Sequence, residues 1–374
     1  MPEADNDDGA RPLRTRVTGV GVGGPVGRNR LGLSPRRPVI LLAAAVLLAA
    51  SILASLFVGS SRIPADQVVH YLLHPDASNV SYNINVLRVQ RTIVGLLVGA
   101  ALAVAGAIMQ AVTRNPLAEP GLLGVNAGAS LGIVLGTAAL GILPVPGQLA
   151  LAAGGALAAT ALVQVIGMIG SAVGAAGGGS PAGSASSPVR LVLIGVAFSA
   201  FAGAVIRGVV LTMPNLFRTF IDWEVGSLTR ADIPLPAMTA LVVLGIGAAL
   251  LLAGALDNIA LGDDVAAALG TRVGLVRAAS LVVITVLCAT ATTVAGPIGF
   301  VGLMAPLTAA WLMGPHRGWI VALCALAGPV VVLSADVLGR VLARPGEMQV
   351  GLLTAFVGSP VLLLMVLRMK DRAS

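Results

Sequence analysis

Ten apolar stretches constrain the fold of this 374-residue chain more than any other feature. A helix of roughly 20 apolar residues crosses the ~30 Å hydrocarbon core of a bilayer. Charged residues make up 10% of the chain and hydrophobic residues 57%, whereas soluble domains are about a quarter charged. We therefore predict an all-α polytopic membrane protein with about ten transmembrane helices, the eighth of them short. The stretches lie at about 38–58, 92–112, 121–141, 148–170, 189–212, 236–256, 276–296, 302–314, 319–340 and 350–367.

The basic residues predict which side of the membrane each loop faces. Ten spans place both termini on the same side. With the termini in the cytoplasm, 15 of the 23 Lys and Arg residues are cytoplasmic and eight are on the outer side. Cytoplasmic loops carry the excess of positive charge in membrane proteins, so we predict that both termini are cytoplasmic. The same rule accounts for the net charge of +7, and we expect no nucleic-acid partner.

Three segments contain too little apolar surface to join a core. Residues 1–37 are predicted to be a disordered cytoplasmic tail and residues 369–374 a short cytoplasmic tail. Residues 171–188, rich in Gly and Ser, are predicted to be a flexible cytoplasmic linker. Residues 38–368 then form one ten-helix membrane domain. The only two cysteines, at 288 and 324, lie in apolar runs and predict neither a disulfide framework nor a metal site.

Two prolines interrupt the chain after the second span. Each proline lacks a backbone N–H and restrains the preceding residue from helical geometry, so a polar turn is predicted here. An ordinary turn between spans explains its polar residues without a further role. The turn contains Asn115, Pro116, Glu119, Pro120 and Gly121.

A short polar helix is predicted between the sixth and seventh spans, within residues 257–275. Acidic residues at its start favour the positive end of a helix dipole, and a glycine at its end suits a C-terminal cap. The residues that define this segment are Leu261, Gly262, Asp263, Asp264, Ala268, Leu269 and Gly270.

Several segments, taken in order, resemble the signature of the FecCD-type permeases, the membrane subunits of type II ABC importers for iron siderophores, heme and cobalamin. The resemblance covers roughly residues 40–370. Any one segment is a weak signal, whereas several long segments in the right order are a strong one. The matching segments are 87–92, 99–103, 106–110, 115–124, 261–264, 268–270, 294–303, 344–347 and 350–351.

The resemblance implies a multi-pass permease domain in a bacterial cytoplasmic membrane. Its implied partners are ABC ATPase subunits, a second permease copy or paralogue, and an extracellular substrate-binding lipoprotein. The ATP and Mg²⁺ would be bound by the ATPase, and no cofactor by this chain. Residues 257–275 would be the coupling segment that docks into the ATPase, a solvated loop being the alternative. The translocation pathway would lie near Gly195, Ser199 and Gly203.

Arginines at the predicted outer side are candidates for docking the binding protein. Similar permeases present such arginines to acidic residues of that protein, which favours orientation and encounter rate. Arginines that snorkel at the membrane edge are the alternative reading. The candidates are Arg88, Arg91, Arg340 and Arg344.

Asp336 is the one carboxylate deep in a predicted span, where an ionisable group is a functional candidate. It lies four residues before Arg340, on the same helical face, so we predict an ion pair that supports Arg340. Proton coupling is the alternative.

The chain lacks the Gly-Lys pair of a P-loop, because its single lysine is at position 370. We therefore expect a transport subunit that is not an enzyme and is driven by a separate ATPase. The substrate preferred by the resemblance is a ferric siderophore, with cobalamin or heme as alternatives. An ion-gradient secondary transporter is the competing class, since such proteins also use interrupted helices.

Overall fold

The computed structural model describes residues 36–141, 143–176, 188–213, 220–221, 223–229, 233–344 and 346–370. Every regular element among these residues is a helix, which confirms the predicted all-α class. The predicted tail before residue 36, most of the predicted linker and the last four residues lie outside the described part.

Each of the ten predicted apolar stretches is helical. Among the described residues, seven helices are long and apolar enough to cross a membrane, and three further apolar helices are shorter. The short ones are α5, α12 and the described apolar part of α14. The ten helices are α1 Arg36–Phe57, α4 Val89–Thr113, α5 Val125–Leu140, α6 Val145–Ala176, α7 Pro188–Thr212, α9 Leu235–Ala260, α11 Val273–Ala295, α12 Val301–Met313, α13 Arg317–Leu342 and α14 Val350–Lys370.

The boundaries of two predicted segments differ in the structure. Helix α6 runs to Ala176, six residues into the predicted 171–188 linker. Its last residues include three alanines, and alanine is the strongest helix former, so the helical ladder continues past the apolar run. Helix α1 begins at Arg36, inside the predicted N-terminal tail.

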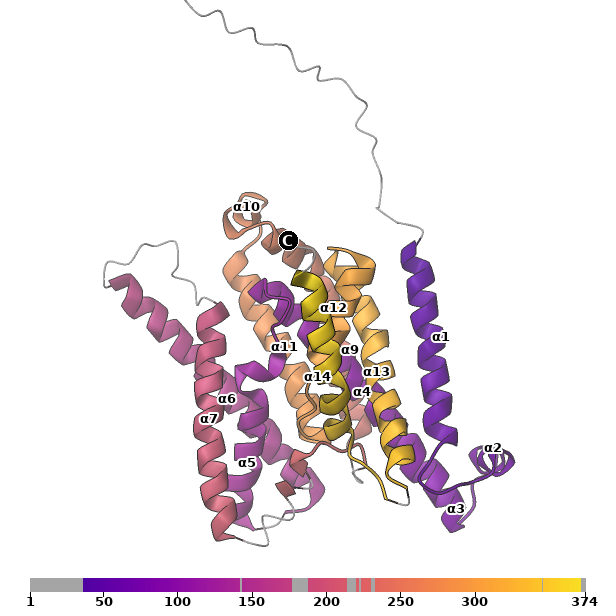
Figure 1. The fold of residues 1–374 in the computed structure, drawn as a ribbon. Helices are drawn as coiled ribbons and strands as arrows, with labels where there is room; N and C mark the ends of the chain where they lie inside the picture. The colour runs from indigo at the N-terminus through magenta and orange to yellow at the C-terminus, as the bar shows by residue number, and fades with distance from the viewer. Residues whose placement is uncertain are drawn as a thin grey trace, which may run out of the picture. The chain divides into compact units, whose positions relative to one another are not determined.

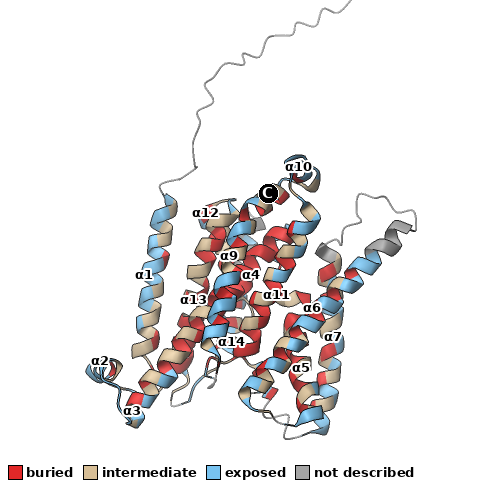
Figure 2. Cartoon of the chain, turned by 180° about the vertical axis from the view of Figure 1, so that it is seen from behind, coloured by how far each residue is buried: buried red, intermediate tan, exposed pale blue. Residues whose placement is uncertain are grey.

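Helix α4 is the centre of the bundle, and almost all of its residues are buried (Figure 2). Glycines allow neighbouring helices to approach its backbone closely, as membrane helices require. A Cβ at Gly99 would meet the backbone of Gly328 and Pro329, 2.6 Å away. A Cβ at Gly106 would collide with the carbonyl of Gly302 on α12. These contacts fix α4 against α13 and α12.

The helical backbone is interrupted at two places, and a short helix follows each interruption. After α4, Arg114 has a positive φ of 51°, and a polar turn leads through the 3-10 helix η2 (Pro120–Leu123) into α5. After α11, Phe300 has a φ of 68° before α12 begins. The Glu119 carboxylate accepts a hydrogen bond from the Phe300 amide at 3.0 Å, so it joins the two breaks. The predicted polar turn is therefore confirmed.

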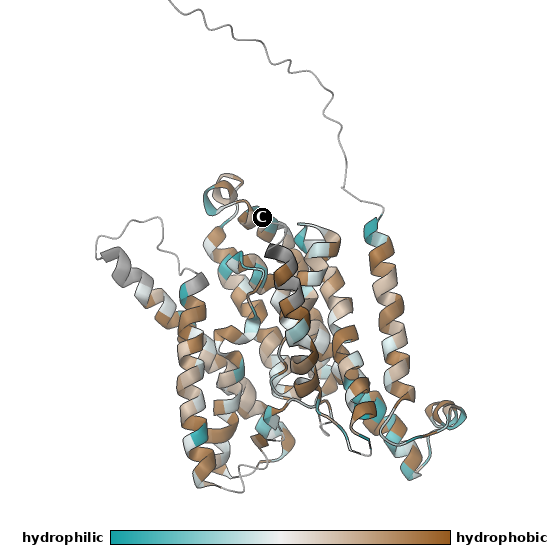
Figure 3. Ribbon diagram, viewed as in Figure 1, coloured by the Kyte–Doolittle hydropathy of each residue, from teal (hydrophilic) through white to brown (hydrophobic). Residues whose placement is uncertain are grey.

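Small helices lie at the two ends of the bundle (Figure 1). Helix α10 (Asp263–Ala268) lies at the end where α1 and α13 begin. At the opposite end lie α2 (Ala65–Leu73), α3 (Asn79–Tyr82) and the π-helix η1 (Asn83–Arg88). The long helices between them consist mostly of hydrophobic residues, as Figure 3 shows. The two ends are thus where polar partners can bind.

Candidate functional sites at the two ends of the helix bundle

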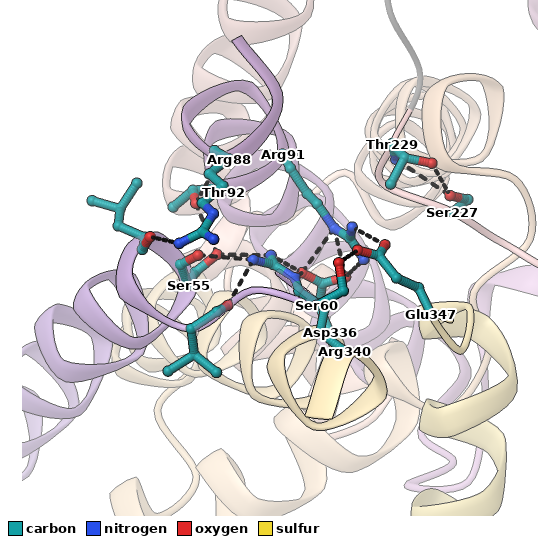
Figure 4. A network of polar contacts seen from close by, with 12 residues as sticks. Ser55, Ser60, Arg88, Arg91, Thr92, Ser227, Thr229, Asp336, Arg340 and Glu347 are labelled. Carbon is teal, nitrogen blue, oxygen red and sulfur yellow. Dashed lines mark hydrogen bonds and ion pairs between the residues drawn. The ribbon is translucent and has the colours of Figure 1, made fainter. Parts of the chain in front are cut away.

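A buried carboxylate organises the α2 end of the bundle. Asp336 on α13 is completely buried. Arg340, one turn later, donates from Nε to its Oδ2 at 2.9 Å, which confirms the predicted ion pair. Arg91 on α4 donates to Oδ1 from Nε at 2.9 Å and from Nη2 at 2.5 Å. One carboxylate therefore holds two arginines from different helices, and the sequence alone did not indicate Arg91 as a partner (Figure 4).

A second carboxylate closes the cluster from the loop before α14. Glu347 accepts from Nη1 of Arg91 at 2.5 Å and from the Ser60 hydroxyl at 2.7 Å. Burial alone would raise the pKa of Glu347, but its hydrogen bond with Arg91 and the arginine charge hold that pKa below its usual value. The Glu347 side chain remains 35% exposed. It is the solvent-accessible acid of an otherwise buried network.

The arginines of this cluster also bind the last carbonyls of α1. Those carbonyls have no partner within the helix, and cations are favoured at this end of a helix dipole. Arg88 donates to the carbonyl of Leu56 at 2.9 Å, and Arg340 to that of Ser55 at 2.8 Å. Arg344 donates to the Gly59 carbonyl, just after α1, at 2.9 Å. The arginines therefore fix the end of α1 to α4 and α13.

This geometry differs from the expected outward presentation of the arginines. The exposed fractions of Arg88, Arg91 and Arg340 are only 4%, 8% and 1%. These side chains turn inward because two carboxylates and the α1 carbonyls satisfy them within the chain. Docking of a binding protein stays a prediction, and it cannot rest on three freely exposed guanidinium groups. A cavity of about 140 Å³ adjoins the cluster, lined among others by Ser60, Arg88, Arg91, Arg340 and Glu347.

At the opposite end, α10 is a capped helix. Gly270 has a φ of +81°, and its amide donates to the Ala267 carbonyl at 2.9 Å. The next amide, of Thr271, donates to the Ala266 carbonyl at 2.9 Å. This pair of bonds is the Schellman motif, in which glycine is favoured at the left-handed position. The predicted acidic start and glycine end of this helix are both present.

Two arginines attach α10 to the long helices. Asp263, in the first turn, forms ion pairs with Arg114 at the end of α4 and with Arg277 of α11, the latter at 3.0 Å. Arg114 also donates from Nε to the Ile259 carbonyl at the end of α9, at 2.8 Å. These contacts attach α10 to α4, α9 and α11.

Three apolar side chains on and beside α10 are exposed. Leu261, Val265 and Leu269 are 64%, 47% and 58% exposed. Val265 and Leu269 are four residues apart and share one side of α10, whereas Leu261 lies at the end of α9, just before the break at Gly262. Asp264 and Ala268 are exposed as well, so most of the predicted coupling residues form a surface rather than a core. An exposed apolar patch with a charged edge is typical of a protein-binding site.

Some of the remaining candidate residues pack against other parts of the chain, and others have no described neighbour close by. Asn115 accepts a hydrogen bond from the Leu117 amide at 3.0 Å, which stabilises the turn at the exposed Pro116. On α7, a Cβ at Gly195 would collide with the Leu122 carbonyl of η2, whereas nothing lies within 4 Å of one at Gly203. Ser199 donates to the Gly195 carbonyl at 2.8 Å. In the described part of the chain, no three His, Cys, Asp or Glu residues gather as metal ligands.

The chain is similar in sequence to permease proteins of iron and heme transport systems. The chain is 42% identical to the ferric enterobactin transport system permease protein FepD of Escherichia coli, over 84% of this chain and 90% of that protein. It is 37% identical to the Fe(3+)-citrate import system permease protein YfmD of Bacillus subtilis, over 83% and 88%. It is 35% identical to the hemin transport system permease protein HmuU of Yersinia pestis, over 77% and 84%.

A solved structure has the same fold. It is an inward-facing metal-chelate type ABC transporter, and it superposes with a TM-score of 0.75 over 88% of this chain and 99% of that chain, at 24% identity. In sequence, residues 47–368 match the FecCD transport family. The resemblance predicted from the motifs is therefore confirmed, and the chain belongs to the FecCD transport family.

Proposed function

We propose that this chain is the transmembrane permease subunit of an ABC importer for a ferric siderophore. The observation that carries this proposal is its 42% identity, over most of both chains, to a ferric enterobactin permease. The relative that is a citrate-iron permease supports the same class of cargo. Heme import is the second candidate, because the hemin permease is also similar over most of its length. ATP and Mg²⁺ are assigned to a partner ATPase.

The α10 surface supports an ATPase partner. Its apolar side chains are exposed, while its backbone is capped and its acidic first turn is fixed to the long helices. Such a helix presents a constant shape to a groove and passes a displacement to the bundle. This end then faces the cytoplasm, in agreement with the arginine distribution. We assign the chain to a bacterial cytoplasmic membrane, as a homodimer or as a heterodimer with a similar permease.

Docking of an extracellular binding protein at the α2 end then requires an exchange of partners. The guanidinium of Arg91 is already paired with Glu347, on an exposed loop beside the cavity. An acidic side chain of the binding protein can reach Arg91 by displacing Glu347. The arginines of the cluster, at 88, 91, 340 and 344, outnumber its two carboxylates, so it keeps a positive charge that attracts an acidic partner.

Uptake measurements test the cargo and the driving force. In a strain lacking this gene, we expect uptake of the radiolabelled ferric siderophore of that bacterium to be lost, and uptake of cobalamin to be unchanged. Deleting the partner ATPase while the ion gradients stay intact should abolish uptake as well. Uptake that survives loss of the ATPase would instead indicate a secondary transporter, and loss of heme uptake alone would favour the second candidate.

The exchange of partners is tested with Glu347→Gln. Without the competing carboxylate, we expect the siderophore-loaded binding protein to bind the reconstituted transporter several-fold more tightly, because an exposed ion pair contributes up to about 1 kcal/mol. Glu224→Gln is the matched control, because it removes an exposed acid at the same end without touching the cluster. Equal tightening in both variants would mean that only net charge matters. Weaker binding by Glu347→Gln would contradict the exchange.

A further inference from the structure

Helix α2 turns a polar face away from the bundle. Val68 is fully buried against the neighbouring helices, whereas His70 and His74 are exposed on the other side. Residues four apart lie on one face of a helix. Asp66, also exposed, precedes His70 by the same spacing. The mechanism of a permease, as argued above, uses none of these side chains.

The two histidines are held close together. Their rings are stacked, with centroids 5.4 Å apart and an interplanar angle of 28°. The helical spacing extends through the cap, because the His74 amide donates to the His70 carbonyl at 2.8 Å. The Tyr71 ring contacts that of His70 edge-on, with centroids 5.2 Å apart. The imidazole pair therefore occupies one small patch at the surface, where small rotations of either ring cost no packing.

This arrangement matches a known requirement of transition-metal binding. Two histidines at positions i and i+4 direct nitrogen ligands to the same point beside a helix, as in zinc metalloproteases. Imidazole nitrogen suits Zn²⁺, Ni²⁺ and Cu²⁺, whereas Mg²⁺ and Ca²⁺ prefer oxygen. The exposed Asp66, four residues before His70, adds a negative charge on the same face, which favours a cation.

We propose that His70 and His74 form a two-histidine site for one divalent transition-metal ion, Zn²⁺, Ni²⁺ or Cu²⁺. No third His, Cys, Asp or Glu joins them among the described residues, so water fills the remaining coordination positions. The ion is therefore exchangeable, unlike a structural zinc with four protein ligands. By linking two successive turns, it stabilises the C-terminal end of α2. The site is independent of the transported chelate.

Metal titration tests this site directly. The full chain is purified in detergent with a tag that contains no histidine, and Zn²⁺ binding is measured by calorimetry. We expect one ion per chain, and we expect His70→Ala or His74→Ala to weaken binding at least about tenfold, because each leaves a single ligand. His316→Ala is the matched control. It removes the chain's third histidine, which is at the opposite end beside Asp257, and should change nothing.

A second measurement separates chelation from a change in folding. Cu²⁺ bound to the wild-type chain should give an electron paramagnetic resonance spectrum with two nitrogen ligands, and to either single variant a spectrum with one. Without metal, the three variants should melt as the wild type does, because these side chains are exposed. Zn²⁺ affinity that is unchanged by both alanine variants, or a one-nitrogen spectrum of the wild type, would overturn the proposal.

Discussion

The two ends of the bundle differ in which side chains they bury and which they expose. At the α2 end, Asp336 and three arginines are buried and satisfied by one another and by backbone carbonyls. At the α10 end, Leu261, Val265 and Leu269 are exposed to solvent, while the charged residues beneath them anchor the helix. The ionic network of the α2 end is complete without a partner, whereas no part of the chain that the structure describes covers the exposed apolar side chains of the α10 end.

This contrast teaches what kind of binding each end can support. An exposed apolar surface gains free energy when a partner removes it from water, so it suits a lasting subunit contact. A satisfied ionic network gains little, because any new partner must replace bonds that already exist. We therefore expect a permanent ATPase at the α10 end, and at the α2 end a protein that binds, delivers its cargo and leaves.

The largest expected effect comes from unbalancing the buried cluster. Asp336→Asn leaves Arg91 and Arg340 buried without their shared counter-charge, and breaking a buried pair costs about 3–5 kcal/mol. We expect a sharply lower yield of folded protein and a lower midpoint of thermal unfolding in detergent. Asp264→Asn, which changes an exposed carboxylate, is the control. A midpoint for Asp336→Asn as high as that of the control would show that the cluster is not needed for stability.

A large effect is also expected at the α10 surface, but on binding alone. Leu269→Asp places a charge where we expect the ATPase to cover an apolar side chain, and truncated hot spots cost about 2 kcal/mol or more. Association with the ATPase should fall about thirtyfold, measured with both subunits in detergent. Leu73→Asp, at a residue that is 70% exposed at the other end, should leave it unchanged. Equal loss in both variants would indicate a general effect of added charge.

An intermediate effect is expected from the cap of α10. Gly270→Ala forces a side chain into a left-handed conformation, at a cost of roughly 1–2 kcal/mol, whereas Gly274→Ala adds a methyl group in open space within α11. Hydrogen exchange of the α10 amides should accelerate only in the first variant, and less uptake should follow each ATP hydrolysed. Unchanged exchange in Gly270→Ala would show that the cap does not hold α10.

Local patterns could be predicted from the sequence, whereas long-range partners could not. The ten apolar helices follow from length and composition, and the Asp336–Arg340 pair from a four-residue spacing. The contact between Arg91 and Asp336 joins residues 245 apart in the chain, and no periodicity encodes it. The inward direction of the arginines was missed for the same reason, because their acceptors at the end of α1 belong to another segment. The coupling role of α10 and the docking role of the arginines stay predictions.

The smallest expected effect separates the exposed acid of the cluster from the buried one. The pKa of Glu347 is lowered by Arg91, so the ionised pair contributes stability that is complete above the unfolded pKa of about 4.3 and is lost as pH falls through the folded pKa. Because this carboxylate is one-third exposed, we expect less than about 1 kcal/mol. Thermal midpoints of the wild type and Glu347→Gln are compared between pH 7 and pH 3. The effects of all other titrating groups cancel in this comparison, because both proteins contain them. The difference between the two thermal midpoints should shrink as the pH falls. A difference that is constant with pH would mean that the negative charge of Glu347 does not contribute to stability.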